Sequence, residues 1–124
     1  MRVAMITLSL AAVLMSLQSP AAPPPVLDKP LSTESKALLR CSAAFAMVAH
    51  GQENGNEAAL KWPDLKTRGR EFFVRSLAQL MDDTGLDRDG ISQLVSAEAQ
   101  TLWDEGQVEA IMPSCLLMLE GSKI

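Results

Sequence analysis

Cys41 and Cys115 are the only two cysteines of the chain, and their chemistry depends on the compartment in which the protein folds. In an oxidising compartment, such a pair indicates a structural disulfide more readily than a metal site or a redox pair. A bridge between them would close a loop that spans most of the chain, and it would stabilise the fold by about 4 kcal/mol. We therefore expect a Cys41–Cys115 disulfide, with two buried free thiols as the alternative.

Residues 1–21 have the pattern of a secretory signal peptide, and they predict that compartment. A basic start at Arg2 is followed by a mostly apolar run over residues 3–17 and then by Ser19-Pro20-Ala21, a small-x-small cleavage site. The apolar run is shorter than the roughly 20 residues that a membrane-spanning helix needs. No cysteine lies beside the cleavage site to carry a lipid. We expect a periplasmic or secreted protein with no stable membrane anchor after signal cleavage.

His50 is the only histidine, which excludes zinc sites built from several histidines and makes any Ser-His-Asp or Cys-His relay depend on one residue. Met47 lies three residues earlier and could form a soft-metal pair with His50, but packing is the favoured interpretation. Residues 82–91 invite comparison with a calcium loop. In the register set by its Asp-Gly-Ile ending, Gly85 and Ser96 occupy the first and twelfth positions, where carboxylates are needed. We expect no metal, no cofactor and no enzymatic activity.

One segment departs from the acidic character of the chain. Its basic and aromatic side chains are Lys61, Trp62, Lys66, Arg68, Arg70, Phe72, Phe73 and Arg75. The favoured interpretation is a solvated face whose cations pair with nearby acids, Asp64 and Glu71. The alternative is a docking surface for an acidic partner protein, or for an anionic ligand held by Arg68 and Arg70. The candidate binding residues are Trp62, Lys66, Arg68, Arg70 and Arg75.

The overall charge limits the classes of partner. The 124-residue chain has 11 basic and 15 acidic residues, a net charge of −4, and loss of Arg2 with the leader makes the remainder more acidic. Nucleic-acid binding needs clustered Lys and Arg against phosphates, so we expect no nucleic acid as a partner. The same charge argues against an anionic lipid surface. With no Tyr, 3 Phe and 2 Trp, the chain also lacks the aromatic surfaces that carbohydrate binders favour.

The chain divides into a leader, a linker and one helical domain. Residues 22–31 form a Pro-rich linker, because Pro23-Pro24-Pro25 and Pro30 favour an extended tether that packs against no core. Residues 32–121 form the domain, in which apolar side chains recur at steps of three and four and give each predicted helix one apolar face. The apolar positions are Leu38, Cys41, Phe45 and Val48 in the first helix, Phe73, Leu77, Leu80 and Met81 in the second, and Leu94, Val95, Ala99 and Leu102 up to Trp103 in the third. Helices are predicted over residues 33–50, from 64 or 67 to 84, over 88–103 and over 108–121, with one possible turn at 57–62.

Local signals mark the ends of these helices. Ser32 and Asp87 are the predicted N-caps, and Gly51 and Gly85 are the predicted stops. Pro113 should kink the last helix or restart it from its own first turn. Since no segment alternates apolar and polar residues as a strand does, we expect an all-α fold. Its architecture should be a small four-helix bundle, stapled by one disulfide between the first and last helices.

Four short motifs resemble those of a group of short exported two-cysteine helical proteins of alphaproteobacteria that have no assigned activity. The motifs are Leu39-Arg40-Cys41, Arg68-Gly69-Arg70-Glu71-Phe72-Phe73, Met81-Asp82-Asp83-Thr84-Gly85-Leu86 and Met112-Pro113-Ser114-Cys115. The resemblance implies a helical domain outside the cytoplasm and nothing catalytic. A looser resemblance is to the small acid-stress chaperones of the bacterial periplasm, from which this chain differs in its wider cysteine spacing and its Pro-rich lead.

Three functional hypotheses follow. The leading one is a non-enzymatic module that binds another protein, with a stress chaperone as its first specific version. The second is an anionic-ligand carrier or an enzyme that uses the basic face from Arg68 to Arg75, together with His50. The third is an immunity-type inhibitor of a secreted toxin.

Overall fold

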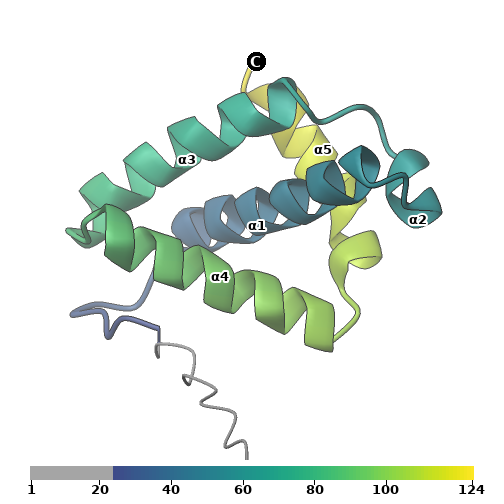
Figure 1. Cartoon of the computed structure of the whole chain (residues 1–124). Helices are drawn as coiled ribbons and strands as arrows, with labels where there is room; N and C mark the ends of the chain where they lie inside the picture. Colours follow the sequence, from purple (N-terminus) through teal and green to yellow (C-terminus); the bar gives the residue numbers. More distant parts are fainter. Residues whose placement is uncertain (1–23) are drawn as a thin grey trace, which may run out of the picture.

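The computed structural model describes residues 24–124, and the regular structure in this part of the chain is all helical. The predicted signal peptide, residues 1–21, lies outside the described residues. The helices are α1 (Thr33–Glu53), α2 (Glu57–Leu60), α3 (Arg68–Thr84), α4 (Arg88–Asp104) and α5 (Val108–Gly121) (Figure 1). The all-α expectation is confirmed, with four main helices packed together and one short turn, α2, where a turn was predicted.

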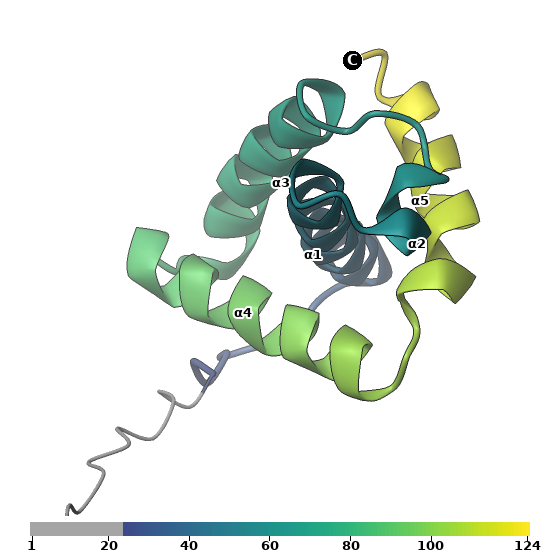
Figure 2. The same ribbon diagram turned by 45° about the vertical axis from the view of Figure 1, so that its right-hand side comes forward.

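Helix α1 is the centre of the domain. Figure 2 views it nearly end-on, with α3, α4 and α5 around it, and α1 packs against each of the other four helices. All residues from Cys41 to Phe45 are buried, whereas a helix that packs on one face buries only every third or fourth residue. The small side chains of Ser42, Ala43 and Ala44 let the neighbouring helices approach. The sequence analysis predicted one apolar face here, and the structure covers this part of the helix on all sides.

The predicted disulfide is confirmed. Cys41 in α1 and Cys115 in α5 are joined, their Cα atoms lie 5.2 Å apart, and their sequence separation is 74 residues. Both side chains lie in the core, at 5% and 2% exposure. The bridge therefore ties the central helix to the last one and shields its sulfur atoms from solvent.

Most predicted helix ends are confirmed by hydrogen bonds. The Ser32 hydroxyl accepts the backbone N–H of Ser35 at 3.0 Å, and the Asp87 carboxylate accepts that of Gly90 at 2.8 Å, so both residues act as N-caps. Helix α3 ends at Gly85, whose φ of 71° lies in the left-handed region that glycine favours.

One predicted helix end is wrong, and one of two alternatives is excluded. Helix α1 does not stop at Gly51 but continues to Glu53. Gly51 serves close packing instead, since a Cβ there would lie only 2.8 Å from the Ala59 Cβ. Helix α5 covers the predicted residues and does not restart at Pro113, since the proline lies inside the helix that starts at Val108. The missing proline N–H costs one hydrogen bond, and the exposed position of Pro113 lets water satisfy the freed carbonyl.

The buried face of α3 includes the predicted apolar positions and extends beyond them. Leu80 is buried as predicted, and Phe73, Leu77 and Met81 pack partly buried against the core. Gly69, Phe72 and Ser76 are also buried. Phe72 meets Phe45 of α1 edge to face, with ring centroids 5.2 Å apart. The small residues Gly69 and Ser76 let α3 approach α1 closely. The spacing of apolar residues in the sequence does not reveal such positions.

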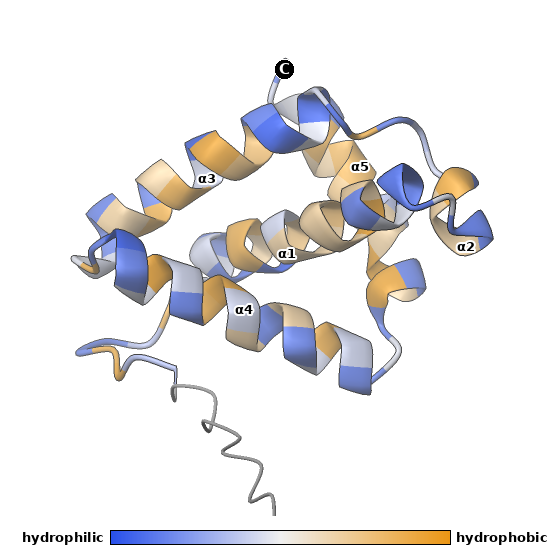
Figure 3. Ribbon diagram, in the orientation of Figure 1, coloured by the Kyte–Doolittle hydropathy of each residue, from blue (hydrophilic) through white to orange (hydrophobic). Residues whose placement is uncertain are grey.

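Hydrophobic residues alternate with hydrophilic ones along α3 and α4, while α5 is largely hydrophobic (Figure 3).

The described part of the predicted linker forms no helix or strand. Leu31 at its end nevertheless packs partly buried against the core, so this end of the linker belongs to the folded domain. Among residues 24–124, no helix is both long enough and apolar enough to cross a membrane.

Candidate functional site

An apolar surface cavity lies where the end of α1, the short α2, the end of α4 and the start of α5 meet, and we call it the tryptophan groove. Its volume is about 410 Å³. Apolar side chains form most of its wall: Met47, Val48, Ala58, Ala59, Trp62, Trp103 and Val108. Its polar lining comes from His50, Asn54, Asn56 and Glu109. The size and the lining suit an apolar side chain or small apolar group.

Trp103 stands at the edge of this groove and is 73% exposed. The sequence analysis placed it at the end of the apolar side of α4, but the neighbouring Leu102 takes the core position and is fully buried. An exposed indole of this size beside an apolar cavity is unusual for a surface residue without a partner. The sequence signal is the Leu102-Trp103 pair, since a helix that packs on one face buries only one of two adjacent residues, although periodicity does not say which one.

Gln52 holds the wall of the groove in place, and the sequence analysis did not single it out. Its side-chain nitrogen donates to the backbone oxygens of Ala59, Trp62 and Pro63, at 3.1, 3.2 and 2.9 Å. Its side-chain oxygen accepts the backbone N–H of Leu65 at 3.1 Å. One amide therefore fixes the connection between α2 and α3, which includes Trp62.

Other side chains of the groove also bind their neighbours. The Asn54 amide donates to the His50 carbonyl at 2.8 Å and lies 3.3 Å from the His50 ring nitrogen Nε2. Lys61 forms an ion pair of 2.6 Å with Glu109 and lies over the Trp62 ring, 5.3 Å from its centroid. Met47 and His50 line the same groove, but no group of three potential His, Cys, Asp or Glu ligands occurs among residues 24–124.

Acidic residues lie in or next to the segments that line the tryptophan groove, and we call them the acidic rim. Glu109 belongs to the lining, Glu53, Glu57 and Asp104 adjoin lining residues in the chain, and Glu105 follows Asp104. All are exposed. Lys61 is already paired with Glu109. The apolar groove therefore opens into a field that attracts cations.

The structure does not gather the predicted basic segment into one face. Lys61 pairs with Glu109 at the start of α5, whereas Nη2 of Arg68 pairs with Glu120 near its end, at 2.8 Å. Arg75 pairs with Glu71 at 2.6 Å, as the solvated-face interpretation predicted. The other predicted partner, Asp64, instead accepts the backbone N–H of Lys66. The two acids on α5 come from the distant end of the chain and could not be found by sequence proximity.

Arg68 also changes the chemistry of its partner. The hydrogen bond and the positive charge from Arg68 hold the pKa of Glu120 below its ordinary value of 4.5. The Arg68 Nε atom donates to the Ile124 backbone oxygen at 3.0 Å. Arg68, proposed from the sequence as an anion-binding residue, therefore holds the last residues of the chain against α3.

Trp62 is separated from most of the basic side chains with which it was grouped. It is half-buried and lines the tryptophan groove, and with Lys66 it also lines a neighbouring cavity of about 480 Å³. Lys66 and Arg70 come together at a further cavity of about 260 Å³, between α1 and the start of α3. Of the charged candidate binding residues, then, Lys66 and Arg70 share a cavity with one another and form no ion pair among residues 24–124.

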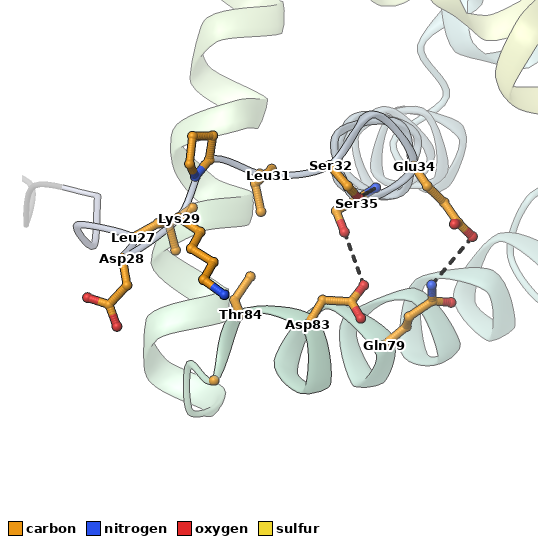
Figure 4. A pocket seen from close by; sticks show the side chains of 12 residues that line it. Leu27, Asp28, Lys29, Leu31, Ser32, Glu34, Ser35, Gln79, Asp83 and Thr84 are labelled. Atoms are coloured by element: carbon orange, nitrogen blue, oxygen red, sulfur yellow. Dashed lines mark hydrogen bonds between the residues drawn. The ribbon is translucent and has the colours of Figure 1, made fainter.

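A cavity of about 580 Å³ separates the N-terminal segment from the end of α3 (Figure 4). The Ser35 hydroxyl donates to Asp83 at 3.0 Å, and the Gln79 amide donates to Glu34 at 3.5 Å. These hydrogen bonds position α1 against α3, so the polar side chains of this cavity have a structural role.

The chain matches no family model, no curated protein and no solved structure in the three comparisons with known proteins.

Proposed function

We propose that this chain is an exported protein that binds another protein through the tryptophan groove and performs no chemistry of its own. The observation that carries the proposal is Trp103, exposed to 73% beside an apolar cavity. Tryptophan is prominent among the residues that dominate binding energy, because it buries a large apolar area at a small cost in conformational entropy. The buried disulfide supports export, since such bridges persist in oxidising compartments.

The acidic rim specifies the chemistry of the partner. A protein segment that places an apolar side chain in the groove brings its flanking residues against Glu57, Asp104 and Glu105. Lys or Arg at those flanking positions would be attracted, whereas Asp or Glu would be repelled. We therefore propose a partner segment that is both apolar and basic, and the net charge of the chain favours the same partner.

The experiment is site-specific photocrosslinking in intact cells, with a photoreactive amino acid at position 103. Leu117 is the matched control, because it is 75% exposed on α5 and equally apolar but does not line the groove. The proposal expects a reproducible adduct from position 103 whose crosslinked peptide is rich in Lys or Arg and apolar residues. Equal adducts from both positions, or an acidic crosslinked peptide, would contradict it.

The stress-chaperone version makes a narrower prediction. If the groove holds exposed apolar segments of unfolding clients, the purified oxidised protein should reduce client aggregation at low pH, and Trp103→Ala should reduce that protection. Unchanged client aggregation in the presence of the wild-type protein would refute this version and leave a single folded partner, such as a secreted toxin, as the proposal.

A further inference from the structure

We propose that the cavity between α1 and the start of α3 binds a small amphipathic carboxylate, independently of the tryptophan groove. Its volume is about 260 Å³. Its apolar wall comes from Phe45, Ala46, Ala49, Leu65 and Phe73, with the backbone of Gly69. Lys66 and Arg70 line it together with His50 and Glu53. We call this the Lys66–Arg70 cavity.

The cations of this cavity differ from the rest of the basic segment in lacking acidic partners. Three other members of the segment each have one, since Lys61 pairs with Glu109, Arg68 with Glu120 and Arg75 with Glu71. Lys66 and Arg70 form no ion pair with any described residue, and they are the two members that line this cavity. Two like charges that line one cavity and form no ion pair repel each other, and a bound anion that contacts both would relieve that repulsion more directly than Glu53 does.

The wall and the charges together define the ligand class. A carboxylate can bind both cations, while Phe73, Ala46 and Ala49 offer an apolar surface for a short hydrocarbon or aromatic tail. Glu53 at the same cavity disfavours ligands with several negative charges. An inorganic anion would leave the apolar wall unfilled, and an alcohol of the same tail would leave both cations without a partner.

The test is calorimetric titration of the purified, oxidised protein with three probes, namely octanoate, inorganic phosphate and 1-octanol, each below its limit of solubility or micelle formation. We expect saturable binding of octanoate and much weaker binding of the other two. Lys66→Glu with Arg70→Glu should weaken octanoate binding at least about tenfold, since charge-assisted hydrogen bonds are lost. Glu53→Gln should tighten it, because a like charge is removed.

Arg75→Glu is the matched control, because it makes the same type of charge reversal on α3 away from the cavity. It should change octanoate affinity by no more than about twofold at physiological salt. The proposal is overturned if phosphate binds as tightly as octanoate, if Arg75→Glu weakens binding as much as the double reversal, or if octanoate does not bind. It is equally overturned if NMR shift changes map to Trp103 rather than to Phe73 and Ala49.

Discussion

The side-chain oxygen of Gln52 accepts the backbone N–H of Leu65 at 3.1 Å, which connects the end of α1 to a residue three positions before the start of α3. The amide nitrogen of the same side chain serves three backbone oxygens of the intervening connection. Since Leu65 is 1% exposed, its N–H would have no other partner in the core. The hydrogen bonds of one side chain thus hold the backbone of a connection that forms no helix of its own between α2 and α3.

Gln52→Ala should lower the free energy of unfolding by about 1–3 kcal/mol, because it leaves the part-buried backbone N–H of Leu65 without its partner. Gln52→Glu is the companion variant: it keeps the acceptor for Leu65 and loses the donor to Ala59, Trp62 and Pro63. Chemical denaturation measures both. We expect both variants to be less stable than the wild type, and a Gln52→Ala protein of wild-type stability would contradict this role.

Removal of the disulfide should lower stability more than any single polar contact. The bridge joins residues separated by 74 positions, and a loop of that length corresponds to about 4 kcal/mol in the chain-entropy description. Cys41→Ala with Cys115→Ala should therefore shift the denaturation midpoint strongly. The wild-type protein should show the same shift when reductant is added under unfolding conditions, and the double variant should not respond to reductant.

Gly51→Ala tests the close approach of α1 and α2. The added Cβ would lie 2.8 Å from the Ala59 Cβ, so the two helices must separate, at a cost of about 1–3 kcal/mol. Gly121→Ala is the control, because a Cβ at the end of α5 meets no atom within 4 Å. That control should be neutral or stabilise by up to about 1 kcal/mol. If both variants had the same stability, the packing explanation for Gly51 would be wrong.

The Arg68–Glu120 pair should give a small, pH-dependent contribution to stability. Because the folded pKa of Glu120 is lowered below 4.5, its contribution is present at pH values above 4.5 and is lost as the pH falls through the lowered pKa. An NMR titration of the Glu120 carboxyl should give a midpoint below 4.5 that rises toward 4.5 in Arg68→Gln. High salt should reduce the shift, since both side chains are exposed. A midpoint unchanged by Arg68→Gln would contradict the pairing.

The fold class and the disulfide could be predicted from the sequence, because they depend on local signals. Helical periodicity marked the four main helices, Ser32, Asp87 and Gly85 marked their ends, and the two cysteines allowed one pairing. The packing of α1 could not be predicted in this way. Gly51 has the sequence context of a helix stop, but it lies inside α1 at a close tertiary contact with Ala59 that its sequence neighbours do not reveal.

The site was harder to predict, because it depends on which side chains the core leaves outside. Periodicity alone could not decide between Leu102 and Trp103 for the buried position on α4. The basic segment was conspicuous in the sequence, yet the acids that neutralise Lys61 and Arg68 come from α5. Only the folded arrangement separates those paired cations from Lys66 and Arg70.

The most direct test of binding through the tryptophan groove is the dissociation constant of the segment crosslinked from position 103, measured for the wild type, Trp103→Ala and Leu117→Ala. Both substitutions remove a large exposed apolar side chain, so each should change stability by no more than about 0.5 kcal/mol. We predict that Trp103→Ala weakens binding at least about tenfold and that Leu117→Ala leaves it unchanged. Equal affinities for the wild type and Trp103→Ala would contradict a binding site at this groove.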